Sequence, residues 1–266
     1  MSTRLSESAA VQGSLWGRRA RDWADLQEAG VAPAYKRVFQ RLDLAPGCRL
    51  LDAGCGAGLA AQYASEAGLQ VSGIDAAEPF LQIARERSPH GDFRLGELLS
   101  LPWPDGSFDA VIGFNSFQYA VDPVAALREA KRVVKPGGKV GIIVWGSIDE
   151  CEAVAHFKAL GSLMPAPPPG APAPPAPLAL EQRIAELAAE AGLKVKTDER
   201  VDCPWLYPDM ATAIRALKSA GPTARVIDHA GEQAVDEALT TCLTNFRQSD
   251  GMILFRNKFR ALTASN

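Results

Sequence analysis

Between residues 48 and 146, short runs of apolar residues alternate with longer stretches in which apolar positions recur every three or four residues. Such alternation is typical of βαβ units, where helices connect the parallel strands of one sheet. This region is therefore predicted to form an α/β domain with a parallel sheet. Its strands are expected at residues 48–53, 70–75, 92–97, 108–114 and 139–145.

The helix between the fourth and fifth of these strands has clear start and stop signals. Asp122 is suited to the N-cap position and Pro123 to the first helical position. The sequence KPGG at 135–138 predicts the end of the helix. One apolar face is expected to carry Val124, Leu127, Ala130 and Val134.

The pattern continues after the fifth strand, although less regularly. Residues 180–192 repeat the helical spacing, and a strand is expected at 194–201. Two further helical patterns cover 209–219 and 231–246. The final β-like run, at 253–264, is separated along the chain from the strand expected at 194–201 by two helical patterns, so these two strands need not be parallel.

Two segments lie outside this repeat. Residues 1–45 contain a helical stretch rich in Trp and Arg, which predicts a helical cap in front of a domain spanning 46–266. Residues 165–177 form a Pro-rich tract, which excludes a helix interior or a central strand. A linker between two domains and a lid inserted after the fifth strand both fit this tract. The lid is favoured, as an insertion over 146–180.

Composition narrows the classes of function. The net charge of −3, the pI of about 5.7 and the absence of a large Lys/Arg cluster make nucleic acid an unexpected partner. No signal peptide is recognised at the N-terminus, and no apolar run approaches the roughly 20 residues of a membrane helix. The five cysteines are scattered, which argues against a metal site or a disulfide framework. A cytoplasmic protein without membrane contact is expected.

The stretch LLDAGCGAGLA at 50–60 follows the first predicted strand, where open parallel sheets usually bind ligands. The dinucleotide fingerprint requires a third small residue where Leu59 stands, and no Lys-Ser/Thr pair completes a phosphate loop. Asp52 would repel a pyrophosphate by roughly 1 to 4 kcal/mol. An NAD-dependent oxidoreductase is therefore disfavoured, and a ligand that is cationic at this end is favoured.

Asp75 ends the second predicted strand, roughly twenty residues after the loop begins, where an acidic side chain can accept hydrogen bonds from ribose hydroxyls. The combination D-x-G-x-G-x-G with this acid resembles the class I S-adenosylmethionine-dependent methyltransferases. The resemblance continues over residues 48–146 and is closest to the bacterial small-molecule branch that includes the quinone-biosynthesis type.

The resemblance implies a Rossmann-like, doubly wound sheet of seven mostly parallel strands with an antiparallel last strand. It also implies S-adenosylmethionine as the cofactor. Glu97 stands where an Asp is more usual, which lengthens its reach to the adenine. By similarity the methionine moiety would lie against Asp52, Gly54, Cys55, Gly56 and Gly58, the ribose against Asp75 and Ala76, the adenine against Glu97 and Leu98, and the sulfonium beside Phe114 and Asn115.

The methyl acceptor is expected to be a small, largely apolar or aromatic metabolite, because the candidate pocket positions are rich in aromatic residues and poor in charge. The segment NSFQY, in place of the [N/D]-P-P-[Y/F] of many nucleic-acid and protein methyltransferases, also favours a small molecule. These pocket positions are Trp16, Arg19, Tyr35, Gln118, Tyr119, Trp145, Trp205 and Tyr207.

The reaction is expected to be an in-line displacement at O, N or C of the acceptor, for which a base is optional. His156 is the candidate base, and Tyr119 is a second catalytic candidate. A homodimer is possible. A protein that binds S-adenosylmethionine for sensing, partner binding or cyclisation, without methyl transfer, is the alternative function.

Overall fold

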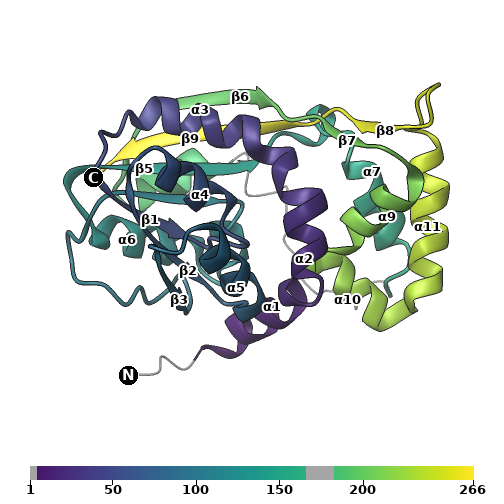
Figure 1. The fold of residues 1–266 in the computed structure, drawn as a ribbon, viewed down its shortest axis with the longest axis horizontal. Coiled ribbons are helices and arrows are strands. Elements are labelled where there is room, and N and C mark those ends of the chain that lie inside the picture. The colour runs from purple at the N-terminus through teal and green to yellow at the C-terminus, as the bar shows by residue number, and fades with distance from the viewer. Residues whose placement is uncertain (1–4, 166–182) are drawn as a thin grey trace.

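The computed structural model describes residues 5–165 and 183–266, and its centre is one seven-stranded sheet in the order β3-β2-β1-β4-β5-β9-β6 (Figure 1). The first five strands are parallel, and β9 is antiparallel to both of its neighbours. The predicted sheet with its antiparallel last strand is confirmed. In sheet order the strands are β3 (Asp92–Leu95), β2 (Gln70–Asp75), β1 (Arg49–Ala53), β4 (Phe108–Phe114), β5 (Val134–Trp145), β9 (Lys258–Ser265) and β6 (Lys194–Asp202).

Helices cover both faces of this sheet, which explains why its strands are apolar throughout. Leu50 and Leu51 are both inaccessible to solvent, yet they belong to different hydrophobic clusters because successive strand residues point to opposite faces. One face carries α3 (Ala32–Leu42), α4 (Leu59–Glu66) and α5 (Glu78–Arg87), and the other carries α6 (Pro123–Val133) and α8 (Ile184–Glu190).

The start of α6 follows its prediction closely. The Asp122 side chain accepts a hydrogen bond from the backbone N–H of Ala125 at 2.9 Å, and Pro123 is the first helical residue. This cap satisfies a donor that the helix itself leaves free.

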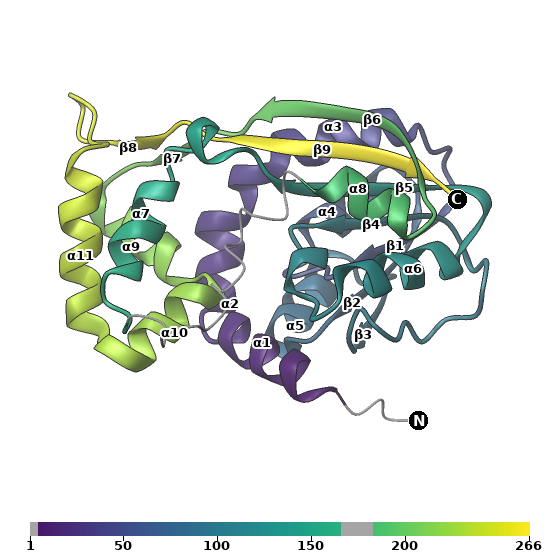
Figure 2. The ribbon, with the colours of Figure 1, turned by 180° about the vertical axis from the view of Figure 1, so that it is seen from behind.

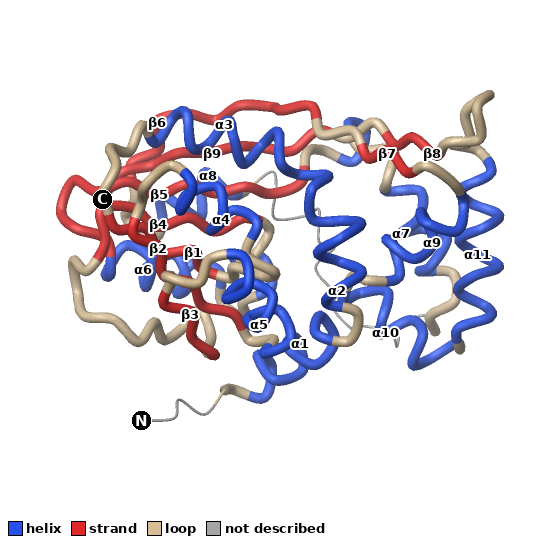
Figure 3. Tube along the Cα trace, viewed as in Figure 1, coloured by secondary structure: helices blue, strands red, loops and turns tan. Residues whose placement is uncertain are grey.

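Beyond the sheet lies a helical lobe, on the right in Figure 1. It contains α7 (Val154–Gly161), α9 (Met210–Lys218), α10 (Gly221–Ala230) and α11 (Glu232–Thr244), with a two-stranded ribbon of β7 (Trp205–Tyr207) and β8 (Ile253–Phe255). Figure 3 shows that β8 and β9 form two strands where the sequence predicted one run. The break lies at Asn257, whose carbonyl accepts from Cys203 N–H at 2.8 Å. Helix α10 was also not predicted.

The N-terminal segment runs between the sheet and this lobe, as Figures 1 and 2 both show. It consists of α1 (Glu7–Gly17), α2 (Ala20–Asp22), a π-helical turn η1 (Trp23–Gln27) and a 3₁₀ turn η2 (Glu28–Val31). Ion pairs Arg18–Asp228, Arg19–Glu232 and Arg215–Asp22 join it to the lobe.

The cap predicted for residues 1–45 includes α3, which packs against β5, β9 and β6. Nearly all of the Pro-rich tract, and much of the insertion predicted for 146–180, lies outside the described residues. Its role as lid or linker therefore stays a prediction. Within 5–165 and 183–266, no helix combines the length and the apolar composition that crossing a bilayer would require.

Candidate functional site

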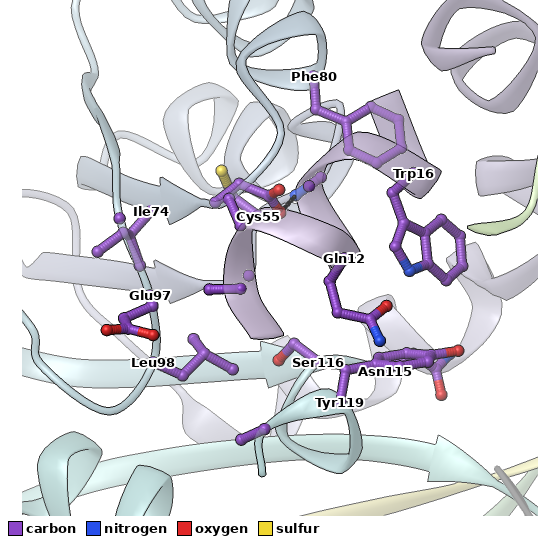
Figure 4. A pocket seen from close by; sticks show the side chains of 18 of the residues that line it. Gln12, Trp16, Cys55, Ile74, Phe80, Glu97, Leu98, Asn115, Ser116 and Tyr119 are labelled. Atoms are coloured by element: carbon purple, nitrogen blue, oxygen red, sulfur yellow. Dashed lines mark hydrogen bonds between the residues drawn. The ribbon is translucent and has the colours of Figure 1, made fainter. Parts of the chain in front are cut away.

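A cavity lies at the carboxyl ends of β1, β2 and β4, where α1 and the η turns of the N-terminal segment cover the sheet edge (Figure 4). The ends of parallel strands are the usual ligand site of such sheets. The lining of the cavity includes Gln12, Trp16, Trp23, Glu28, Tyr35, Gly54, Cys55, Gly56, Asp75, Ala76, Phe80, Glu97, Leu98, Phe114, Asn115, Ser116 and Tyr119.

The three glycines of the loop after β1 have positive φ angles but serve different purposes. A Cβ on Gly54 would lie 2.4 Å from the Cβ of Ser116, so this glycine allows the loops after β1 and β4 to meet. A Cβ on Gly58 would lie 2.7 Å from the Cβ of Ala84, so this glycine allows α4 to approach α5. Only Gly56 has open space, and the nearest atom to its added Cβ would be Glu28 Oε1 at 3.8 Å.

Asp75 organises the loop from the end of β2. Its Oδ2 accepts from Gly56 N–H and its Oδ1 from Ala77 N–H, each at 2.9 Å. Burial raises the pKa of Asp75, and these backbone donors oppose that rise. Because a carboxylate offers about four acceptor positions, Asp75 can still accept bonds from a ligand in the cavity that it lines.

The opposite end of the cavity is formed by the loop after β3. Glu97 and Leu98 lie together beside Ile74, on the left in Figure 4. Ser6, which caps α1, donates its hydroxyl to Glu97 Oε2. The beginning of α1 is thereby held against the part of the cavity expected to receive the adenine.

Three carboxylates lie close enough at the loop end for their charges to interact: Glu28 and Asp52, which are buried, and Asp75, which is partly buried. Burial raises the pKa of each, and Asp75 raises the pKa of both Glu28 and Asp52 further. Arg87 pairs with Glu28 at 2.5 Å, whereas neither Asp52 nor Asp75 has an ion-pair partner within the described chain. Asp52 Oδ2 is buried without any hydrogen-bond partner there. One cation thus faces three acids, which is a costly arrangement unless a ligand adds positive charge.

These residues fit the expected S-adenosylmethionine. Its sulfonium and ammonium would supply the missing positive charge, Asp75 would accept from the ribose hydroxyls, and Glu97 from the adenine amino group. Of the predicted cofactor residues, Gly54, Cys55, Gly56, Asp75, Ala76, Glu97, Leu98, Phe114 and Asn115 line the cavity. Asp52 and Gly58 are not among its lining residues: Asp52 is buried in β1, and Gly58 packs against Ala84 of α5.

Aromatic rings form the remaining wall. Tyr35 and Phe114 stack with ring centroids 4.8 Å apart, and Trp16 meets Tyr119 edge to face at 5.5 Å. Burial raises the pKa of Tyr119 far above that of a free phenol, so this side chain is a proton-bearing donor at neutral pH. Trp16, Tyr35 and Tyr119 are the predicted acceptor residues that line this cavity.

The other predicted acceptor residues lie elsewhere in the described chain. Arg19 pairs with Glu232 at 2.6 Å, and Gln118 Nε2 donates to Asn115 Oδ1 at 3.3 Å. Trp145, Trp205 and Tyr207 are buried. They pack at the junction of the sheet and the helical lobe, where the Tyr207 hydroxyl donates to Gln27 Oε1 at 2.7 Å.

His156 belongs to the same junction. It is 2% exposed on α7, its ring centroid lies 4.0 Å from that of Phe157, and it is not among the cavity residues of the described chain. Burial lowers its pKa to about 4. This position gives no support to a role as the catalytic base.

The sequence interpretation missed Gln12, Trp23, Glu28, Phe80 and Ser116. Gln12, Trp23 and Glu28 belong to the N-terminal segment, whose path over the sheet edge no local pattern reveals. Phe80 lies in the first turn of α5, the helix that follows β2, and Ser116 lies in the loop just after β4. Their position after strand ends was a usable signal, because residues there face the ligand edge of the sheet.

Comparison with known proteins gives consistent results. A family model described as a methyltransferase domain matches residues 51–142. The chain is 30% identical over 215 residues to a malonyl-[acyl-carrier protein] O-methyltransferase of Erwinia pyrifoliae, covering 79% of this chain and 75% of that one. It is 41% identical over 108 residues to a ubiquinone biosynthesis O-methyltransferase of Xanthomonas oryzae pv. oryzae, covering 39% of this chain and 45% of that one.

Among solved structures, the [4+2]-cyclase SpnF matches with a TM-score of 0.55 and 25% identity, covering 87% of this chain and 80% of that one. The fold and these relatives therefore point to the same family.

Proposed function

We propose that this chain, which belongs to the S-adenosylmethionine-dependent methyltransferases, transfers the methyl group to an uncharged, largely apolar or aromatic small molecule. The cofactor supplies a methyl group on a sulfonium, which leaves as a neutral thioether. The acceptor must then approach that methyl group in line, with water excluded.

The observation that carries this proposal is the kind of side chain lining the cavity. Among its described residues there is no Lys, Arg or His, and the charged ones are Glu28, Asp75 and Glu97. An anionic acceptor would find no cationic side chain in this lining and would be repelled by its carboxylates, which opposes its binding. A neutral acceptor bound against Trp16 and Tyr119 meets no such cost.

The same lining bears on the chemistry. Tyr119 is protonated at neutral pH and can donate a hydrogen bond to an acceptor oxygen, but it cannot take up a proton. His156 is not among the described residues that line the cavity. We infer that alignment by the aromatic wall carries most of the catalysis and that the acceptor supplies its own nucleophile, at O, N or C.

A matched pair of acceptors tests the charge argument. Catechol and its carboxylated analogue 3,4-dihydroxybenzoate present the same hydroxyls, and they differ in one carboxylate. The protein is incubated with labelled S-adenosylmethionine and either this pair or a metabolite extract. Products that have gained one methyl group should be found mainly among the uncharged compounds. Mass spectrometry after ion-exchange separation identifies them.

Labelled products confined to the anionic fraction would contradict the proposal. A malonyl-[acyl-carrier protein], named for the Erwinia relative, belongs in the assay as the competing acceptor. A product of unchanged mass would instead indicate chemistry without methyl transfer.

A further inference from the structure

Glu28 is a buried acid of the cavity wall that belongs to no recognised motif. It begins the η2 turn, its side chain is 5% exposed, and it faces the glycine loop across from Gly56. It lines the cavity together with Gly54, Cys55 and Gly56. A buried carboxylate costs free energy unless it is paired with a cation and hydrogen-bonded.

Arg87 and Leu59 fix the orientation of this carboxylate. Arg87 Nη1 donates to Glu28 Oε2, and Leu59 N–H, at the start of α4, donates to Glu28 Oε1 at 3.3 Å. Arg87 also donates to the carbonyls of Ala57, at 2.8 Å, and Ala24, at 3.0 Å. The arginine thus holds the N-terminal segment, the glycine loop and α5 together, with the Glu28 carboxylate at the edge of the cavity.

Two polar groups near Glu28 lack, in the described chain, a hydrogen-bond donor, which is what an ammonium would provide. Asp52 Oδ2 and Ser116 Oγ are both buried and have no hydrogen-bond partner within the described residues. Ser116 lines the cavity and touches Gly54, next to the part of the loop that Glu28 faces. Arg87 neutralises only one of the three acids there.

We propose that Glu28 is a cofactor-binding residue that receives the ammonium of the amino-acid end of S-adenosylmethionine, and that Arg87 positions it. This inference rests on the cofactor site described above. It assigns the cofactor's amino-acid end to a residue from outside the βα repeat, so that the cofactor joins the N-terminal segment to the glycine loop.

A different arrangement would place the cofactor's carboxylate near Arg87 and the N-terminus of α4, where anions are often bound. Glu28 already occupies both sets of donors, so a second carboxylate there would meet like charge. The two arrangements predict opposite effects when the charge of Glu28 is removed.

The test compares three ligands by isothermal titration calorimetry on the full chain. S-adenosylmethionine and S-adenosylhomocysteine both carry the amino-acid end, whereas methylthioadenosine lacks it. Glu28→Gln keeps the shape and one acceptor oxygen for Leu59 N–H. It should weaken binding of the first two ligands by about 10- to 100-fold, the usual size of a lost charged hydrogen bond, and leave methylthioadenosine within about twofold.

Two matched variants locate the effect. Glu97→Gln, at the opposite end of the cavity, should weaken all three ligands together. Glu86→Gln, next to Arg87 in sequence but exposed and paired with Arg21, should change none of them.

Equal losses for all three ligands in Glu28→Gln would show a purely structural role and overturn the inference. Tighter binding of the two amino-acid ligands would also overturn it, because the cofactor's carboxylate would then occupy this place. If the unaltered protein bound none of the three, the cofactor site itself would be wrong, a result distinct from the failure of Glu28 alone.

Discussion

Two groups of aromatic residues lie near the carboxyl ends of the strands, and only one of them faces a cavity. Trp16, Tyr35 and Tyr119 line the cofactor cavity. Trp145 and Trp205, which the sequence interpretation placed in the same pocket, lie with ring centroids 5.1 Å apart inside the junction of sheet and lobe. The same residue types therefore form a binding wall in one place and a packed core in the other.

Strand pairing explains the difference. Trp145 is paired with Phe259 across β5 and β9, and Trp205 with Phe255 across β7 and β8, so each ring has a partner fixed by the backbone. The η2 turn then closes over Trp205, since a Cβ on Gly30 would lie 2.5 Å from the indole. The cavity rings instead come from separate segments that meet around an open space. Proximity to a strand end thus indicates a binding residue only where no other strand or turn fills the space.

The largest expected effect is that of replacing Trp205, one of the packed aromatic residues at the junction of sheet and lobe, with Ala. The loss of a buried indole should lower the free energy of unfolding by about 3 to 5 kcal/mol, measured by urea denaturation. Affinity of the folded variant for S-adenosylmethionine should fall less than in Trp16→Ala, because Trp205 is not among the described cavity residues, although it packs against the turn that carries Glu28.

Trp16→Ala is the matched control for that experiment, since Trp16 is only partly buried and lines the cavity. It should affect ligand binding more than Trp205→Ala does. The reverse ranking of the two variants would show that the distinction between wall and core is incorrect.

Replacing Asp75 with Ala tests the cavity group, with the next largest expected effect. The variant loses the acceptor for Gly56 and Ala77 N–H and any bonds to the ribose. Affinity for S-adenosylmethionine in calorimetry should fall by about 100-fold.

Because Asp75 serves the ribose in this scheme, methylthioadenosine should lose affinity to the same extent. That pattern separates Asp75 from Glu28. Unchanged binding of both ligands would remove Asp75 from the cofactor site.

The cofactor end was predictable because its determinants are local. A glycine loop after an apolar strand and an acid ending the next strand are set by neighbouring residues, and parallel pairing then brings them to one edge of the sheet. The seven mostly parallel strands with an antiparallel last strand were expected from the family resemblance.

The N-terminal cover and the helical lobe could not be predicted so well. Whether Glu28 lies over the glycine loop depends on Arg87, 59 residues later, and on the π and 3₁₀ turns that carry it there. The pattern around 253–264 looked like one strand because its apolar residues continue on both sides of Asn257, whereas its strand partners change there from β7 to β5 and β6. Long-range partners of this kind leave no trace in the local pattern.

The smallest expected effect is that of His156 on how the free energy of unfolding depends on pH. Its pKa is about 4 in the folded protein, lowered from 6.5 by burial, so the unfolded chain binds more protons between these two values. Stability from the neutral ring is complete above pH 6.5 and is lost as the pH falls toward 4. Between pH 7 and pH 5 the original protein should lose about 2 kcal/mol more than His156→Leu, measured by urea denaturation at each pH.

The same variant distinguishes a packed histidine from a catalytic one. As a core residue, His156 can be replaced by an apolar side chain of similar volume with normal methyl transfer at pH 7, whereas replacing a catalytic base would reduce kcat by about 100-fold or more. His90→Gln serves as the control for nonspecific effects on either measurement, because His90 is an exposed residue of a turn and is not among the described cavity residues. Full activity combined with a flatter pH profile of stability would place His156 in the core of the junction. Loss of activity at unchanged cofactor affinity would instead extend the active site across the junction, and the separation of the two aromatic groups would fail.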